Sequence, residues 1–236
     1  MEHGMHDPSY FEYRQVTPEA YAAYRIPPYL RPQLPADRNA RILDFGCGFG
    51  QLMGALVAEG YRNVCGVDVL PAAMEHCRSR GLEVIDGSRR EDLLARQGEY
   101  SLIVVNHVLE HLEKARIIPL LADLGSLLAK GGALVAMVPN GQSNTGAYWA
   151  YEDFTHTTLF TSGSLLYVLR AAGFAQVDFL DVDCTAGLPW FKRIVRRLLL
   201  SVYRASYVFW NRVTDSHTHA PSPLIFSYEI KAVARA

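Results

Sequence analysis

Hydrophobic and polar positions follow two different rhythms through the middle of the chain. Arg41–Phe45, Asn63–Val67 and Tyr100–Val105 are short and mostly apolar, as strands buried on both faces of a parallel sheet are. Between them lie stretches of helical composition, among them Gln51–Glu59 and Leu112–Ala129, the second of which ends just before two glycines. Further strands are predicted at Leu82–Ile85, Ala133–Val138, Ala175–Leu180 and Leu224–Val233. This alternation predicts an α/β fold, a doubly wound and mostly parallel sheet of seven strands with helices on both faces.

Two regions lie outside this alternation. Residues 1–40 carry five tyrosines and several prolines, and we expect them to form an N-terminal cap segment on a domain that spans residues 41–236. The second region is an insert at about 184–222. Within it, Trp190–Val213 has apolar residues at helical spacing together with six Lys or Arg residues and no acid. We expect a basic amphipathic helix there.

Composition narrows the class of protein. Half of the 236 residues are hydrophobic and 20% are charged, so the chain can bury a core and is not wholly disordered. The net charge of −1 gives no overall attraction to nucleic acid, and no nucleic-acid partner is expected. No secretory signal and no apolar run of the ~18 residues needed for a membrane span is visible, so we expect a cytoplasmic protein. The cysteines lack zinc-site spacing and are expected to be reduced: Cys47, Cys65, Cys77 and Cys184.

The end of the first predicted strand carries a glycine-rich loop. Gly46, Gly48 and Gly50 alternate with larger residues, and Asp44 precedes them by two positions. Glycines in this pattern let the backbone turn tightly and approach a ligand closely. The nicotinamide fingerprint G-x-G-x-x-G would need glycine at position 51, where Gln51 stands, so an oxidoreductase is disfavoured. Asp68 ends the second strand 22 residues after Gly46, which suits hydrogen bonds to a ribose diol.

Together with Gly66–Asp68 and Tyr100–Leu112, this loop resembles the motifs of class I S-adenosylmethionine-dependent methyltransferases. The resemblance covers roughly residues 38–182. It is closest to the ubiquinone-pathway O-methyltransferases and to methyltransferases of bacterial cell-surface glycan clusters. It implies a Rossmann-like sheet with the last strand antiparallel, S-adenosylmethionine as the cofactor and S-adenosylhomocysteine as the product.

The resemblance also implies a set of cofactor contacts. Asp44 and the Gly46–Gly50 loop would hold the methionine end, Asp68 would bind the ribose hydroxyls, and Val69 would flank the adenine. Ser88 stands where the family usually has an acid beside the adenine edge. The remaining expected contacts are Gly87, Asn106, His107 and, from the N-terminal segment, Tyr13.

The acceptor side is predicted after the fifth strand. His156 lies in a D-x-T-H stretch that resembles many glycan-type methyltransferases, and Asp153 precedes it by three residues. We expect His156 to act as a general base, with Asp153 orienting its imidazole. Tyr148, Trp149 and Tyr151 are expected to bind the acceptor through their aromatic faces. Glu110 and His111 are expected to cap or anchor a helix. No further acid pair with metal-ligand spacing accompanies this stretch, so no metal is expected.

These features favour O-methylation of a sugar or a sugar-containing metabolite. Two alternatives stay open: O-methylation of a phenol, quinone precursor or polyketide-like molecule, and a non-catalytic module that binds the cofactor or docks on membranes. The basic helix Trp190–Val213 has three possible partners of its own, which are its own domain, a second subunit in a homodimer, or an anionic membrane surface touched peripherally.

Overall fold

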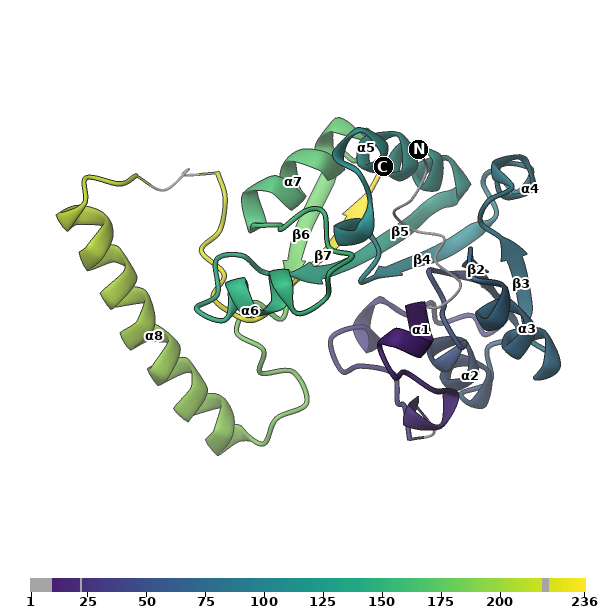
Figure 1. The fold of residues 1–236 in the computed structure, drawn as a ribbon, viewed down its shortest axis with the longest axis horizontal. Coiled ribbons are helices and arrows are strands. Elements are labelled where there is room, and N and C mark those ends of the chain that lie inside the picture. Colours follow the sequence, from purple (N-terminus) through teal and green to yellow (C-terminus); the bar gives the residue numbers. More distant parts are fainter. Residues whose placement is uncertain (1–9, 22, 218–220) are drawn as a thin grey trace.

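The computed structural model describes residues 10–21, 23–217 and 221–236. Within them, seven strands form one sheet in the order β3-β2-β1-β4-β5-β7-β6 (Figure 1). Neighbouring strands are parallel except for β7, which runs antiparallel to both β5 and β6. This confirms the predicted Rossmann-like sheet. The strands are β1 (Arg41–Phe45), β2 (Asn63–Asp68), β3 (Glu83–Asp86), β4 (Tyr100–Asn106), β5 (Leu128–Pro139), β6 (Gln176–Leu180) and β7 (Glu229–Arg235).

Helices cover both faces of the sheet because alternate residues of the buried strands point to opposite sides. Leu43 joins one apolar cluster, which packs mainly under α4, α5 and α7, whereas Ile42 joins the other, under α2 and α3. Their bounds are α2 (Gln51–Ala58), α3 (Pro71–Ser79), α4 (Arg90–Leu94), α5 (Lys114–Leu127) and α7 (Ser162–Ala171). Short helices lie in the connections: α1 (Tyr10–Tyr13), η1 (Pro18–Tyr21), η2 (Arg31–Gln33), η3 (Leu109–His111) and α6 (Gly146–Tyr151).

The N-terminal segment does more than cap the domain. Ile26, Tyr29 and Leu30 are all less than a tenth exposed and belong to the second apolar cluster, beside α2. They therefore form part of the core of the sheet, so this stretch of the N-terminal segment is packed into the sheet domain.

The last strand begins five residues later than the sequence predicts. Residues 224–227 have strand-like alternation, but the side chain of Asn140 donates hydrogen bonds to the carbonyls of Ile225 and Ser227 at 2.8 and 2.7 Å. These carbonyls are therefore fixed to a buried amide at the end of β5 instead of to a neighbouring strand. The ladder of β7 starts at Glu229.

The predicted basic helix is present as α8 (Trp190–Val213), which lies beside the layered body and has no buried residue (Figure 1). Its contacts with the rest of the domain are few. Tyr203 and Tyr207 meet the ring of Phe226 edge-on, and Arg197 pairs with Asp183 at 2.7 Å. Among the described residues, no helix is long and apolar enough to cross a membrane.

Candidate active site

The strand order reverses between β1 and β4, and open α/β sheets bind ligands at this edge. The glycine loop follows β1 here. Gly46, Gly48 and Gly50 all have positive φ, at 78°, 53° and 74°. A Cβ added at Gly46 would lie 2.3 Å from a methyl of Val108, so this close approach requires glycine. The loop leads directly into α2, whose N-cap is Gly50.

Asp68 fastens the tip of β2 to this loop. Its Oδ2 accepts a 2.8 Å hydrogen bond from the Gly48 amide, and its Oδ1 accepts from the amides of Val69 and Leu70. Asp68 is not the N-cap of α3, because that position is Leu70. The carboxylate stays partly exposed, and its oxygens have further acceptor capacity for a diol.

Asp44 is a buried carboxyl behind the loop, only 4% exposed. Burial, together with the nearby charge of Asp68, raises the pKa of Asp44 to about 7. A cationic group placed beside it would favour the ionised form. The glycine backbone, Asp68 and Asp44 together fit a cofactor with a ribose diol and a cationic amino-acid end.

The predicted adenine contacts lie at and beyond the ends of β2 and β3. The Gly87 amide donates to the carbonyl of Asp68 at 2.8 Å, and a Cβ at Gly87 would lie 3.1 Å from the side chain of Val69. Ser88 is exposed and donates from both its amide and its hydroxyl to Asp86. The expected roles of Val69, Gly87 and Ser88 stay predictions.

The N-terminal segment contacts the site through Phe11 and Tyr10, and the expected cofactor contact of Tyr13 stays a prediction. Tyr13 is 76% exposed. Phe11 instead packs on Phe49 with ring centroids 4.4 Å apart, and its ring tip lies 4.0 Å from where a Cβ on Gly48 would be. The Tyr10 hydroxyl donates to Asp153 at 2.8 Å. The tyrosine-rich composition drew attention to this segment, but no signal in the sequence ranked Tyr10 and Phe11 above Tyr13.

Asn106 and His107 lie at the tip of β4, next to the glycine loop. The Tyr29 hydroxyl and the Asn106 side chain are 3.5 Å apart. His107 has a positive φ of 52° and its ring lies between two carboxylates, Glu110 at 3.0 Å and Glu229 at 3.2 Å. Burial lowers the pKa of His107, but these hydrogen bonds and charges outweigh it and raise the pKa to about 10.

The expected pair of Asp153 and His156 is not formed. Asp153 accepts from the amide and hydroxyl of Thr155 at 2.9 and 2.6 Å, as well as from Tyr10. Burial raises the pKa of Asp153, but these hydrogen bonds outweigh it and hold the pKa at about 2. The ring of His156 turns the other way, and its Nδ1 lies 2.9 Å from the carbonyl of Trp149. Asp153 is instead connected through Thr155 to His111, whose Nδ1 lies 2.8 Å from the Thr155 hydroxyl.

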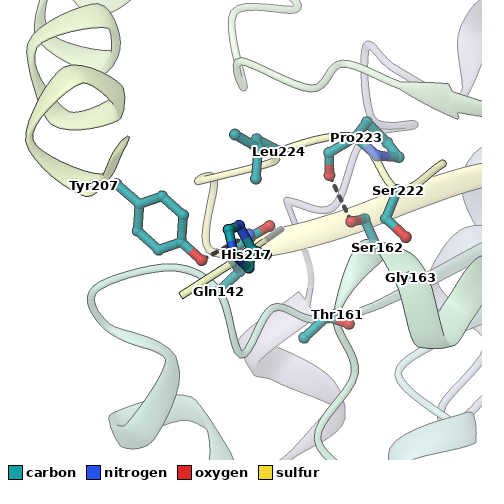
Figure 2. Close-up of a pocket in the computed structure, with 9 residues that line it drawn as sticks. All are labelled: Gln142, Thr161, Ser162, Gly163, Tyr207, His217, Ser222, Pro223 and Leu224. Atoms are coloured by element: carbon teal, nitrogen blue, oxygen red, sulfur yellow. Dashed lines mark hydrogen bonds between the residues drawn. The ribbon is translucent and has the colours of Figure 1, made fainter. Parts of the chain in front are cut away.

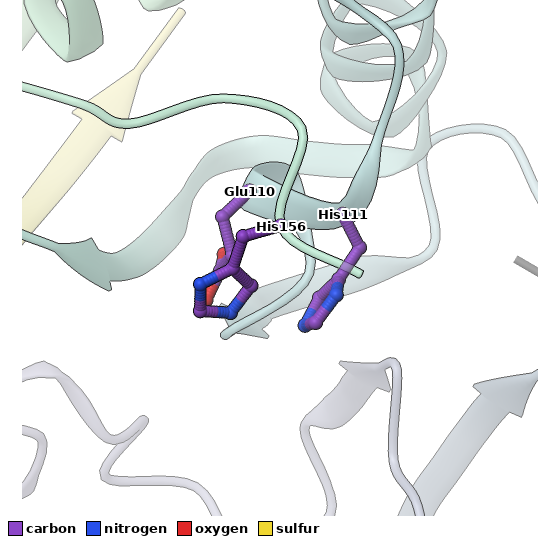
Figure 3. Close-up of side chains that lie close together, drawn as sticks. All are labelled: Glu110, His111 and His156. Atoms are coloured by element: carbon purple, nitrogen blue, oxygen red, sulfur yellow. The ribbon is translucent and has the colours of Figure 1, made fainter. Parts of the chain in front are cut away.

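Glu110, His111 and His156 come together on the acceptor side (Figure 3). One ligand atom from each side chain lies within 4.8 Å of the other two. Glu110 and His111 belong to η3, whereas His156 comes from the loop after α6. From the sequence, Glu110 and His111 are expected only to cap or anchor a helix. The D-x-T-H stretch pointed to His156, but nothing in the sequence placed it against η3.

The predicted acceptor aromatics are mostly open to solvent. Tyr148 and Tyr151 on α6 are 61% and 84% exposed. Trp149 is half-buried and packs against Tyr228, which the sequence analysis missed, with ring centroids 5.7 Å apart. Their role in acceptor binding stays a prediction.

A separate pocket of about 390 Å³ lies between the start of α7 and α8 (Figure 2). None of the predicted cofactor or catalytic residues lines it. Tyr207 closes one side, and Ser162 is held there by a 2.6 Å hydrogen bond to the carbonyl of Pro223. This pocket is therefore distinct from the site at the glycine loop.

Two curated relatives and one solved structure illustrate what the chain is similar to. It is 30% identical over 178 residues to the tRNA U34 carboxymethyltransferase of Haemophilus influenzae strain PittEE, covering 68% of this chain and 52% of that protein. It is 35% identical over 119 residues to the ubiquinone biosynthesis O-methyltransferase of Xylella fastidiosa, covering 48% of this chain and 46% of that protein. A SAM-dependent methyltransferase from Archaeoglobus fulgidus shares the fold, with a TM-score of 0.65 and 21% identity, over 96% of this chain and 97% of that chain.

The chain thus spans about half the length of the curated relatives it matches. The family model described as a methyltransferase domain matches residues 12–178, which is more than half of the chain. This range contains the glycine loop, Asp68 and the acceptor-side cluster. From the family model, the strand order and the geometry of the glycine loop, the chain belongs to the methyltransferase domain family, as a class I S-adenosylmethionine-dependent methyltransferase domain.

Proposed function

We propose that the protein transfers the methyl group of S-adenosylmethionine to a hydroxyl oxygen of a sugar or a sugar-containing metabolite. The observation that carries this proposal is the pair of imidazoles, His111 and His156, beside the end of β4. In both rings Nδ1 is hydrogen-bonded, which leaves Nε2 free to face an acceptor. A hydroxyl needs such help because it must lose a proton, whereas an amine acceptor carries its own lone pair.

The cofactor supplies an activated methyl group on a sulfonium, so the protein has mainly to position the acceptor and exclude water. Asp44, Asp68 and the Gly46–Gly50 loop hold the cofactor in this proposal. His156 lies where it would receive or share the proton of the acceptor hydroxyl, and Asp153 supports the neighbouring His111 through Thr155. Trp149 and Tyr228 offer aromatic faces to a sugar ring.

Two other acceptor classes are suggested by the names of relatives. One relative is a ubiquinone biosynthesis O-methyltransferase, which supports a phenolic acceptor. Another is a tRNA carboxymethyltransferase, and the Arg residues of α8 would suit an RNA backbone. The net charge of −1 speaks against the second.

We infer that α8 attaches the enzyme to the cytoplasmic face of an anionic membrane. Apolar residues recur along one stripe of the helix and are 50–69% exposed: Phe191, Val195, Leu198, Val202, Phe209 and Val213. Lys192 and Arg212 lie on either side of this stripe, and Trp190 and Trp210 lie near its two ends. Three other Arg side chains bond back to the domain: Arg193, Arg196 and Arg197. Charge complementarity to acidic lipids and interfacial tryptophans both favour a lipid surface over a second protein subunit. An acceptor linked to a lipid would be found there.

Methyl transfer is tested with labelled S-adenosylmethionine against nucleotide sugars, lipid-linked glycans, catechols and total tRNA. Turnover on a glycan acceptor supports the proposal. Turnover confined to catechols or to tRNA overturns the sugar assignment, and cofactor binding without turnover on any of them favours the non-catalytic module.

Membrane attachment is tested by co-sedimentation with vesicles that contain 30% or no phosphatidylserine, roughly the range over which basic helices respond to surface charge. Leu198→Glu and Val202→Glu should abolish binding to the acidic vesicles. The control Val57→Glu, at an exposed apolar position on α2, should leave it unchanged. A stable dimer in solution that does not bind vesicles, and that the same two variants dissociate, would instead assign the stripe to a second subunit.

A further inference from the structure

We propose that Glu110, His111 and His156 form a binding site for a divalent transition-metal cation, which holds and activates the acceptor hydroxyl. The binding itself stands on the geometry of these three residues. The activating role rests on the proposed function, because it concerns the same acceptor side of the site.

The hydrogen bonds around the two histidines determine where their lone pairs point. The Thr155 hydroxyl donates its single hydrogen to Asp153, so towards His111 it acts as an acceptor, and His111 Nδ1 must carry the hydrogen. The carbonyl of Trp149 can only accept, so His156 Nδ1 carries its hydrogen as well. With its hydrogen on Nδ1, each ring has its lone pair on Nε2, a common metal-binding atom in proteins.

The third member, Glu110, is a buried carboxylate that pairs with His107 through only one of its two oxygens. Glu110 is 1% exposed, and its Oε1 is hydrogen-bonded to His107. Its Oε2 has no hydrogen-bond partner within the described part of the chain. A buried carboxylate oxygen without a donor costs a large part of its desolvation energy, and native proteins rarely leave one so. One nitrogen of each imidazole and one oxygen of this carboxylate lie within 4.8 Å of one another. A cation bound among them would give Glu110 Oε2 the partner that it lacks.

The ligands are also held in place before any ion arrives. The carbonyl of Glu110 accepts hydrogen bonds from the amides of Thr157 and Thr158 at 2.8 and 3.1 Å, which clamps the His156 loop onto η3. Asp153, Thr155 and the Trp149 carbonyl fix both rings from behind. Metal-binding histidines have this kind of support on the nitrogen that does not bind the ion.

Two histidines and one carboxylate bind divalent transition metals and leave coordination positions open. An acceptor hydroxyl in an open position would have a lowered pKa and would release its proton to solvent. The oxygen then forms a bond to the methyl carbon as the carbon–sulfur bond breaks, and the electron pair of that bond stays on sulfur. In this arrangement His156 acts as a ligand, and the cation replaces it as the group that activates the hydroxyl.

The first test measures binding without any acceptor. The full chain, freed of metal by a chelator, is titrated with Co²⁺ under visible spectroscopy, and Zn²⁺ is then used to displace it. We expect one equivalent of Co²⁺ with ligand-field bands. Glu110→Gln, His111→Ala and His156→Ala should each weaken binding by at least about tenfold. Absence of stoichiometric binding, or equal binding by all three variants, overturns the site.

Matched controls separate loss of ligands from loss of fold. Glu113→Gln and His217→Ala change exposed residues of the same types and should leave Co²⁺ binding unchanged. His156→Ala removes a half-exposed side chain from a loop, so it should disturb the fold least. Each variant is also titrated with S-adenosylhomocysteine, and binding at the unaltered affinity shows that its sheet is intact.

The second test separates this inference from the proposed function. If His156 is only a base, Glu110→Gln should cost little turnover and a chelator none. If the cation activates the acceptor, Glu110→Gln and His156→Ala should lower turnover alike, and Zn²⁺, Mn²⁺ or Co²⁺ should restore the chelated wild-type enzyme. Metal binding without turnover on any acceptor would leave the site standing and overturn the function. Turnover that survives chelation would overturn the activating role.

Discussion

The cofactor half and the acceptor half of the site are built in different ways. The cofactor half consists of backbone turns at the ends of β1, β2 and β3, where Asp68 and the glycine loop are joined by a direct hydrogen bond. The acceptor half joins η3 to a loop some 45 residues further along, through side chains that contact one another only in the folded chain. Substitutions in the first half should therefore act on cofactor affinity, and substitutions in the second on turnover.

The largest expected effect is on the acceptor half. His156→Ala should lower turnover by about 100-fold or more, whether the imidazole acts as base or as ligand, because the hydroxyl then keeps its proton. Affinity for S-adenosylhomocysteine should stay within twofold of wild type, by calorimetry. A loss of cofactor affinity equal to the loss of turnover would show that the two halves are not separable.

The next effect is on the cofactor half. Asp68→Ala should weaken S-adenosylhomocysteine binding by about 1–3 kcal/mol, because the ribose hydroxyls and the Gly48 amide lose their acceptor. The control Asp92→Ala, at a half-exposed position on α4 that pairs with Arg89, should bind normally. Unchanged affinity in Asp68→Ala would remove this residue from the site.

A smaller effect is expected at Asp44, which should make cofactor affinity depend on pH. The pKa of Asp44 is raised to about 7, so at pH 6 the free protein holds a proton there. Binding of the cationic amino-acid end favours the carboxylate and must expel that proton. Affinity for S-adenosylhomocysteine should therefore rise by roughly five- to tenfold between pH 6 and 7.5, since each pH unit below the pKa lowers the ionised fraction of Asp44 by about tenfold. Asp44→Asn should flatten this pH dependence, and a steep dependence in that variant would contradict the assignment.

The smallest effect concerns the N-terminal segment. Phe11→Ala should weaken S-adenosylhomocysteine binding by about 0.5–1.5 kcal/mol, the usual contribution of one aromatic pair, because the contact with Phe49 is lost. Tyr13→Ala should have no effect, since that ring is exposed. If Tyr13→Ala weakens binding and Phe11→Ala does not, then Tyr13 is the cofactor contact, as the sequence suggests.

The contrast between the halves also explains what could be predicted. The alternation of strands and helices, the glycine loop and Asp68 follow from local patterns, because short-range backbone geometry dictates which residues occur there. The direction of the His156 ring depends on the Trp149 carbonyl, and the partner of Asp153 depends on where Tyr10 and Thr155 lie. Spacing suggested a helical pair of Asp153 and His156, but the stretch is a loop. Tertiary contacts then override what three-residue spacing implies.

The short helix α1 contacts both halves at once. Phe11 packs against the glycine loop, and Tyr10 is bonded to Asp153 on the acceptor side. Since α1 has four residues and none is buried, it has little stability of its own and depends on these two attachments. Such a segment opens more easily than the sheet beneath it. We therefore expect α1 to act as a gate, whose opening precedes release of the spent cofactor.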